Sequence, residues 1–147
     1  SRINAIQETL QDKELTLQQK YGIYGRLYEE YAPYQFDKAR DMLLMQESIA
    51  DSLSDQVLKT TASLNKAFLY TTAGMFLEAS KAFETLDTLS FDYHQKIIWY
   101  NAAQRFLTDY QEYMQGSGVA VPGAEKIQSY RNLILEHVIT RFLLYIA

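Results

Sequence analysis

The chain has 147 residues, 48% of them hydrophobic, which is enough for one domain with a substantial core and excludes a disordered chain. Its net charge of -4 comes from acidic and basic residues interleaved along the sequence, so we expect no direct nucleic-acid contact by this segment. The absence of cysteine excludes disulfides and thiolate chemistry, and it is compatible with either redox compartment.

The start of the sequence indicates a piece of a longer protein. It begins Ser-Arg-Ile-Asn, with neither an initiator Met nor a signal peptide. No apolar run reaches about 18 residues, so no transmembrane helix is predicted. We therefore expect any membrane attachment to come only through missing parts of the parent chain.

Two helices are predicted before Pro33. Residues 1–14 carry apolar side chains three and four positions apart, as on one face of a short leading helix. These side chains are Ile3, Ile6 and Leu10. Thr16 and Gln19 have the spacing of a capping box and predict the start of a tyrosine-rich helix over 17–32, which Pro33 ends.

Three more helices are predicted over 35–51, 55–73 and 76–88. The first places a set of apolar residues inward, namely Phe36, Ala39, Leu43, Ile49 and Ala50. The segment 51–55 is typical of a turn that supplies a helix N-cap. Gly74 is expected to end the second helix and to permit a tight turn into the third.

The C-terminal part begins with a second capping box, formed by Asp92 and Gln95. It opens a long helix over 93–115 whose apolar residues cover more than one face, so both sides are expected to pack. The glycines of 116–123 predict the longest and most mobile loop. A final helix is expected to start near Pro122.

Residues 138–147 are apolar nearly all round but are too few to span a bilayer. Two interpretations stay open for this segment. It is either buried against its neighbours or downstream chain, or it forms a homodimer interface.

A recurring pattern of small and aromatic residues then relates these helices to one another. Its clearest copy is Ala67, Tyr70, Gly74, Phe76, Ala79, Phe83 and Leu86. It resembles the tetratricopeptide repeat (TPR), in which two short antiparallel helices form one unit. Related patterns begin at Tyr21 and Trp99. Two departures are the 40-residue step from Ala39 to Ala79, where the family has 34, and Lys66 at a usually apolar position.

The resemblance implies an all-α fold of about seven helices, a TPR-like array of antiparallel helix pairs in a right-handed superhelix. It implies a single domain over 1–147 and no catalysis. Its parts are the leading helix 1–14, degenerate repeats over 16–51, 55–88 and 92–138, and the helix end 139–147. The expected function is protein or peptide interaction.

A narrower resemblance rests on residues 24–39, Tyr-Gly-Arg-Leu-Tyr-Glu-Glu-Tyr-Ala-Pro-Tyr-Gln-Phe-Asp-Lys-Ala, preceded by a polar helix. This run is similar to the N-terminal region of TPR-containing transcriptional regulators of Bacteroides-type bacteria. The resemblance implies signal transduction by a helical-repeat region on the periplasmic side of the envelope, followed by a membrane span, a coiled coil and a DNA-binding part. A cytoplasmic location stays open.

Candidate site residues lie on two helices, and their role depends on the helix register. For the tyrosines of 17–32, one count points Tyr24 and Tyr28 into the core, with Gly25 at the small position of the repeat. A second count, about 200° away, makes them line a peptide groove. The residues that would line this groove are Tyr21, Tyr24, Tyr28 and Tyr31. A separate count from Ala79 predicts a groove on the middle repeat, lined by Thr61, Leu64, Asn65, Phe68 and Thr72.

Other chemistry is not indicated. His94 and His137 have no partner at a metal-binding spacing, and no nucleophile motif or phosphate loop is present, so we expect no catalytic residues, metal or cofactor. The groove lacks the Lys, Asn and Arg set that clamps a peptide carboxylate. Two alternatives stay open, a small-molecule sensor with an aromatic pocket and a structural dimerisation module.

Overall fold

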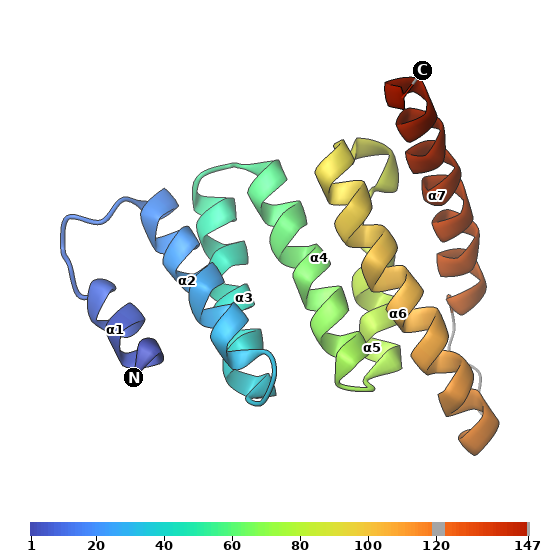
Figure 1. Ribbon diagram of the computed structural model, residues 1–147. Helices are drawn as coiled ribbons and strands as arrows, with labels where there is room; N and C mark the ends of the chain where they lie inside the picture. Colours follow the sequence, from blue (N-terminus) through green and yellow to red (C-terminus); the bar gives the residue numbers. More distant parts are fainter. Residues whose placement is uncertain (119–122, 147) are drawn as a thin grey trace. The chain divides into compact units, whose positions relative to one another are not determined.

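The computed structural model describes residues 1–118 and 123–146 (Figure 1). Within these residues the chain forms seven α-helices, one short 3-10 helix and no strand. In chain order the elements are α1 (Arg2–Thr9), α2 (Leu17–Tyr31), α3 (Phe36–Ser52), α4 (Gln56–Thr72), α5 (Phe76–Glu84), the 3-10 helix η1 (Thr88–Ser90), α6 (Tyr93–Ser117) and α7 (Ala124–Ile146). The predicted all-α fold of about seven helices is confirmed.

The helices group into two compact units, Ser1–Leu69 and Tyr70–Ala147, and the boundary falls inside α4. The expected division into three degenerate repeats within a single domain stays a prediction.

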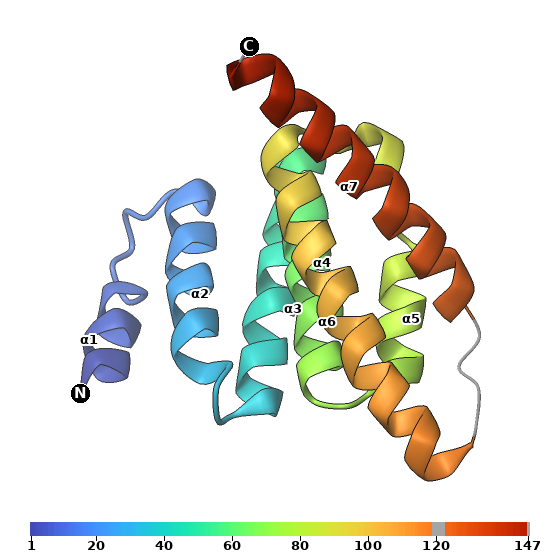
Figure 2. The same ribbon diagram turned by 45° about the vertical axis from the view of Figure 1, so that its right-hand side comes forward.

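In the first unit, α2 and α3 form an antiparallel pair and α1 packs beside α2 (Figures 1 and 2). The core contains Ile6, Ile23, Leu27, Tyr28, Tyr31, Ala39, Leu43 and Leu69. The predicted inward face of α3 is confirmed for Ala39, Leu43, Ile49 and Ala50, which are buried. Phe36 is half-buried and packs against the core. A side-chain hydrogen bond from Gln7 Nε2 to the Tyr31 hydroxyl (2.8 Å) also joins α1 to α2.

The ends of these helices follow from local side-chain chemistry. Thr16 accepts a hydrogen bond from the Gln19 backbone amide (3.1 Å), and the Gln19 side chain accepts one from the Thr16 amide (2.8 Å), so the predicted capping box is confirmed. After α3, Ser54 adopts a positive φ of 51°, which ends the helix. The Asp55 carboxylate then accepts a hydrogen bond from the Leu58 amide (3.0 Å) and caps α4.

Lys66 finds a partner on the neighbouring helix. Its ammonium group lies 2.9 Å from the Glu47 carboxylate on α3, and the two side chains are only 23% and 18% exposed. The Ser63 hydroxyl donates to the same carboxylate (3.3 Å). Glu47 is therefore half-buried, because it neutralises a lysine at a normally apolar position of the repeat.

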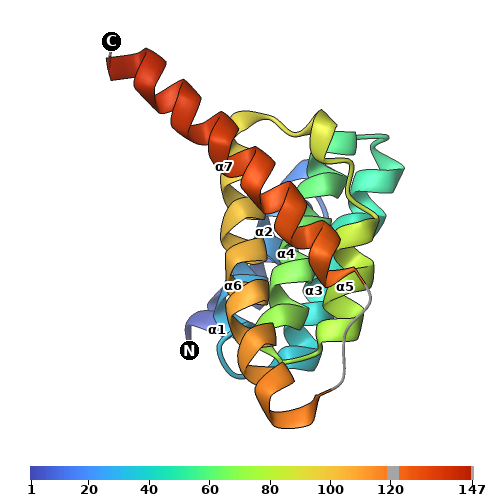
Figure 3. The same ribbon diagram turned by 90° about the vertical axis from the view of Figure 1, so that its right-hand side faces the viewer.

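In the second unit, α7 lies across α5 and α6 (Figure 3). Aromatic rings join the three helices. Trp99 on α6 makes edge contacts with Phe83 on α5 (5.9 Å between ring centroids) and with Tyr130 on α7 (6.4 Å). Phe76 on α5 meets Phe106 in the same way (5.7 Å). The prediction that the long helix packs on more than one side is confirmed by these contacts.

Gly74 separates α4 from α5 with a φ of +74°, as predicted. The Met75 amide donates to the Tyr70 carbonyl (2.9 Å), the pattern of a Schellman motif. At the start of α6, Asp92 and Gln95 form the second predicted capping box.

Two boundaries differ from the predictions. Helix α5 ends at Glu84 instead of residue 88, because the Thr85 hydroxyl bonds back to the Ala82 carbonyl (2.7 Å) and the Asp87 carboxylate caps η1. Helix α6 continues through Ser117 until Gly118 adopts a φ of +68°, so 116 and 117 do not belong to the predicted loop. The remaining part of that loop, 119–122, lies outside the described residues.

None of the helices in the described part of the chain is long and apolar enough to cross a membrane. At the end of α7, the described side chains Ile139, Leu143 and Leu144 are exposed, Leu144 to 74%. Burial of this segment by other chain and its use as a dimer interface both stay predictions.

Candidate functional site

The four tyrosines of α2 differ in burial. Tyr31 is 3% exposed and Tyr28 is 9% exposed, and both belong to the core of the first unit. Tyr24 is half-buried and packs against that core. A groove-lining role for the tyrosines stays a prediction, and it falls mainly to Tyr21 and Tyr24.

Tyr21 is half-buried and connects two helices. Its hydroxyl donates a hydrogen bond to the Leu58 carbonyl of α4 (2.7 Å). Burial raises the pKa of Tyr21 from its ordinary value of 10.0 to about 12, and the charge of Asp55 acts in the same direction. Burial also raises the pKa of Tyr28 to about 12, with a smaller effect from the charge of Glu29.

The candidate residues of α4 lie in three environments. Leu64 is fully buried. Three others, Thr61, Asn65 and Phe68, are half-buried, and Thr72 is exposed. The Thr61 hydroxyl donates to the Val57 carbonyl one turn earlier (3.0 Å). Groove lining by this set also stays a prediction.

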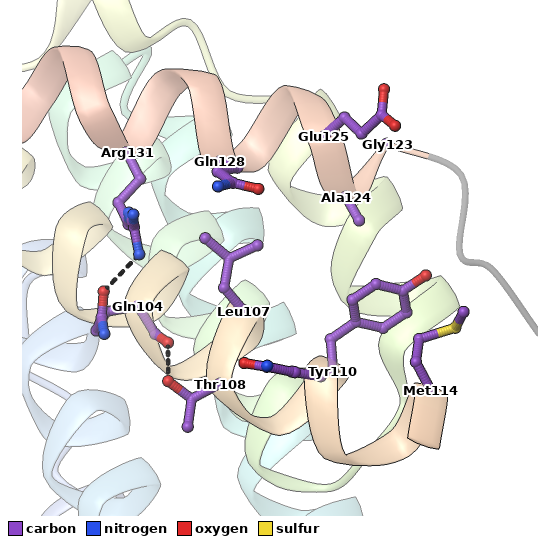
Figure 4. Close-up of a pocket in the computed structure, with 11 residues that line it drawn as sticks. Gln104, Leu107, Thr108, Tyr110, Met114, Gly123, Ala124, Glu125, Gln128 and Arg131 are labelled. Carbon is purple, nitrogen blue, oxygen red and sulfur yellow. Dashed lines mark hydrogen bonds between the residues drawn. The ribbon is translucent and has the colours of Figure 1, made fainter. Parts of the chain in front are cut away.

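A cavity of about 830 Å³ lies instead between α6 and α7 (Figure 4). Its volume is within the range of natural ligand pockets. The lining residues of α6 are Gln104, Leu107, Thr108, Tyr110, Gln111 and Met114, and those at the start of α7 are Gly123, Ala124, Glu125, Gln128 and Arg131.

One wall of this cavity is formed by a guanidinium group. Arg131 donates from Nη1 to Gln104 Oε1 (3.0 Å; Figure 4). It also donates from Nη2 to Asn132 Oδ1 (3.0 Å). Its Nε is buried and has no hydrogen-bond acceptor among the described atoms. A buried donor without an acceptor costs free energy, and this nitrogen is closed to solvent.

Two further polar groups come from opposite helices. Gln111 on α6 and Gln128 on α7 line the cavity, and both side chains are exposed to solvent. Each amide offers two donors and one acceptor oxygen. The cavity therefore presents solvent-accessible amide groups on both of its walls.

The apolar part of the lining is already well packed. Tyr110 stacks on Phe106 (5.7 Å between centroids, 19° between planes) and on Tyr113 (6.4 Å, 28°). Leu107 and Met114 lie to either side of it along α6. The lining of the cavity therefore combines these apolar side chains with the polar ones.

None of these eleven residues was expected to form a site. On α6 the polar residues Gln104, Thr108 and Gln111 follow one another at spacings of four and three positions. On α7 Gln128 and Arg131 are three positions apart. Each helix therefore carries a polar stripe on one face. Such stripes are the signal in the sequence. They do not by themselves show that the two helices face each other.

A second cavity of about 350 Å³ lies beside η1 and is lined by Leu86, Asp87, Thr88, Leu89, Lys96, Tyr130, Leu133 and Ile134. Across the described residues, no three side chains of His, Cys, Asp or Glu could together hold a metal ion. His94 is exposed, and the side chain of His137 lies outside the described residues.

Comparison with models of known protein families shows the family of this chain. A family model described as the SusR N-terminal TPR domain matches residues 1–146. The chain belongs to this family. Searches among curated proteins and among solved structures found no match. Membership confirms the predicted resemblance to the TPR-like region of Bacteroides-type regulators, and a TPR-type domain is an interaction module that typically has no catalytic role.

Proposed function

We propose that this chain is the sensing part of a bacterial transcriptional regulator and that it works by binding a protein or peptide partner. The α6–α7 cavity carries the proposal, because it combines a ligand-sized volume with side-chain amides on two walls. Membership of the SusR N-terminal TPR family supports the regulatory context and the interaction role.

The test changes the cavity in the full-length protein. Gln111→Leu with Gln128→Leu removes both amides at nearly constant volume, and we expect the response of a transcriptional reporter to its inducing signal to be lost. Gln115→Leu is the matched control, since Gln115 is an exposed residue of α6 outside the cavity. An unchanged reporter response, with normal protein level and melting temperature, would contradict the proposal.

The cavity volume also favours a second candidate, a small-molecule sensor. A pocket of about 830 Å³ accommodates a metabolite as readily as a peptide segment. Native mass spectrometry of the purified chain tests this candidate. A co-purified small molecule that is lost from the Gln111→Leu/Gln128→Leu variant would support it.

The exposed end of α7 supports a structural role that is compatible with either candidate. We infer that Ile139, Leu143 and Leu144 contribute to a homodimer interface, since three exposed large apolar side chains lie within six residues. Deletion of 138–147 should then convert a dimer into a monomer in light scattering. An unchanged mass would reject this role.

A further inference from the structure

We propose that two copies of this chain pair through a patch beside η1, in which Leu89 of each copy inserts into the second cavity of the other copy. The patch consists of η1 and the part of α7 that lines this cavity with it. This inference rests on the homodimer of the proposed function and names the contact that holds it.

Leu89 protrudes from the surface. It is the most exposed of the large apolar side chains in the described part of the chain, at 95%. A single exposed leucine is common on protein surfaces. Leu89, however, lies beside a second exposed leucine, Leu133 on α7 (62%), and both line the same cavity. A protein surface that covered the protruding side chain and the cavity together would remove all of this apolar area from water.

The turn that carries Leu89 is fixed on both sides. Asp87 caps η1 by accepting a hydrogen bond from the Leu89 amide (3.1 Å), and the Ser90 hydroxyl donates to the Asp87 carbonyl (2.7 Å). Directly after the turn, Phe91 is buried and Asp92 begins α6 with its capping box. Leu89 is therefore presented without the entropy cost that ordering a flexible loop would add to association.

The second cavity has room for a leucine side chain. Its volume is about 350 Å³, whereas an apolar cavity of about 150 Å³ already holds benzene. Its apolar walls are Leu86, Tyr130, Leu133 and Ile134. Ile134 is buried, and Leu86 and Tyr130 are half-buried, so the inner wall belongs to the fold and Leu133 forms the rim.

The protruding side chain and the cavity lie on one patch, which makes the patch complementary to itself. In a two-fold dimer, each contact between a residue of one copy and a residue of the other occurs twice. A two-fold axis between Leu89 and the cavity would bury both leucines at once. A small apolar molecule would fill the cavity but leave the outer face of Leu89 in water, so a second copy is the better occupant.

The charges of the patch also suit a second copy. Asp87 and Lys96 are the charged residues of the cavity lining, and they have opposite signs. Two such patches do not repel each other, and the two-fold arrangement brings Asp87 of one copy towards Lys96 of the other.

The patch continues along α7 towards its exposed apolar end. Leu144 follows Leu133 by eleven positions, about three helical turns, so the two leucines lie on the same face. Leu144 is 74% exposed. A contact formed by one turn and one helix face is small for a permanent complex, so we expect the dimer to form at micromolar concentrations.

The test measures the mass of the purified 147-residue chain by light scattering over about a hundredfold range of micromolar concentrations. We expect the unchanged chain to approach the mass of a dimer as the concentration rises. Leu89→Asp should raise the dissociation constant about tenfold or more, because each dimer loses two buried leucines. Its circular dichroism spectrum should stay unchanged, since Leu89 is exposed.

Leu77→Asp is the matched control, at an exposed leucine of α5 outside the patch. It should leave the dissociation constant within about twofold. An equal rise in both variants would show a general effect of surface hydrophobicity and would overturn the inference.

Disulfide trapping identifies the contact itself. The chain has no cysteine, so a single-cysteine variant reacts only through the introduced thiol. Tagged Leu89→Cys mixed with untagged Leu133→Cys under a mild oxidant should give a mixed disulfide dimer, because a disulfide needs the two Cβ atoms about 4 Å apart. Leu89→Cys mixed with Leu77→Cys should give little of it. Equal yields from the two mixtures would contradict the proposed contact.

The outcomes also separate this inference from the interface inferred at the end of α7. If deletion of 138–147 abolishes the dimer while Leu89→Asp keeps it, the dimer exists but the patch beside η1 does not hold it, and this inference fails. If Leu89→Asp abolishes the dimer while the deletion keeps it, this inference stands and the end of α7 is not the interface. A monomer at every concentration would contradict both.

Discussion

Lys66 shows how a single residue departs from the repeat pattern without disturbing the fold. Its position usually holds an apolar side chain, and here the Glu47 carboxylate compensates for the charge at 2.9 Å. Both side chains are mostly removed from water, so each needs the other. The sequence showed that Lys66 departs from the repeat pattern, but it did not predict the ion pair with Glu47, because Glu47 lies 19 positions away on another helix.

We predict that Glu47→Ala lowers the free energy of unfolding by about 1–3 kcal/mol, because it leaves a half-buried ammonium group unpaired. The double variant Glu47→Leu/Lys66→Met should recover most of this loss, since apolar residues replace the pair. Urea unfolding measures both. Asp51→Asn, which breaks the exposed pair with Lys59, is the control and should cost less. An equal loss in the single and double variants would contradict the account.

The raised pKa values of two tyrosines predict a stability change at alkaline pH. Tyr21 and Tyr28 have pKa values of about 12 in the folded chain, above the ordinary value of 10.0. The folded state therefore holds these protons more tightly, and their contribution to stability is complete below about pH 10 and is lost as the pH rises towards 12. Unfolding at pH 8 to 11.5 should show this decline.

The double variant Tyr21→Phe/Tyr28→Phe should flatten the decline above pH 10, because neither phenyl ring titrates. Tyr34→Phe, at an exposed side chain, is the matched control. If the double variant loses stability with pH as steeply as the unchanged chain, the two hydroxyls do not cause the effect.

At the scale of the element, helix α2 contains two glycines with different surroundings. No atom lies within 4 Å of a Cβ built on Gly22, whereas a Cβ on Gly25 would lie 2.9 Å from Gln46 Nε2. That nitrogen donates to the Tyr21 carbonyl (3.0 Å). The close approach of Gln46 explains why a small residue stands at Gly25, as the repeat pattern predicted.

We therefore predict that Gly22→Ala raises the free energy of unfolding by about 0.5–1 kcal/mol, the gain in helix propensity at an open site. Gly25→Ala should give little or no gain, because the added methyl group displaces the Gln46 amide and costs about 0.5–1.5 kcal/mol of hydrogen bonding. Urea midpoints of the two variants give the comparison. Equal gains would show that Gln46 moves away freely.

Local signals predicted the elements well where one side chain determines a helix end. The capping boxes of Thr16 and Asp92 and the turn at Gly74 all have short-range causes. The predicted end of α5 was wrong by four residues. The side chains of Thr85 and Asp87 compete with the helix for backbone hydrogen bonds, and hydrophobic periodicity carries no information about this competition.

At the scale of the whole molecule, the boundary between the two compact units falls within α4. Because helix formation is cooperative along a continuous segment, we predict that the units unfold together. The single Trp99 lies in the second unit, so its fluorescence reports that unit, whereas circular dichroism reports all the helices. The two denaturation curves should coincide. Separate midpoints would show that the units unfold independently.

The cavity could not be predicted from the sequence, because it depends on how two helices cross. Its polar stripes on α6 and α7 are visible in the sequence, but a cavity forms only where the crossing of two helices leaves space between them. The four tyrosines of α2 were predicted as candidate groove residues, and two of them, Tyr28 and Tyr31, belong to the core. Residue type predicted the fold better than it predicted the site.

The most direct test of the central claim follows the side-chain amides of the cavity by NMR. A ¹⁵N-labelled chain is titrated with a capped, uncharged six-residue peptide, and the NH₂ signals are assigned with Gln→Leu and Asn→Asp variants. We predict that the signals of Gln111 and Gln128 shift and saturate while that of Gln115 stays in place. A shift of the Asn65 signal on α4, with Gln111 and Gln128 unchanged, would contradict it.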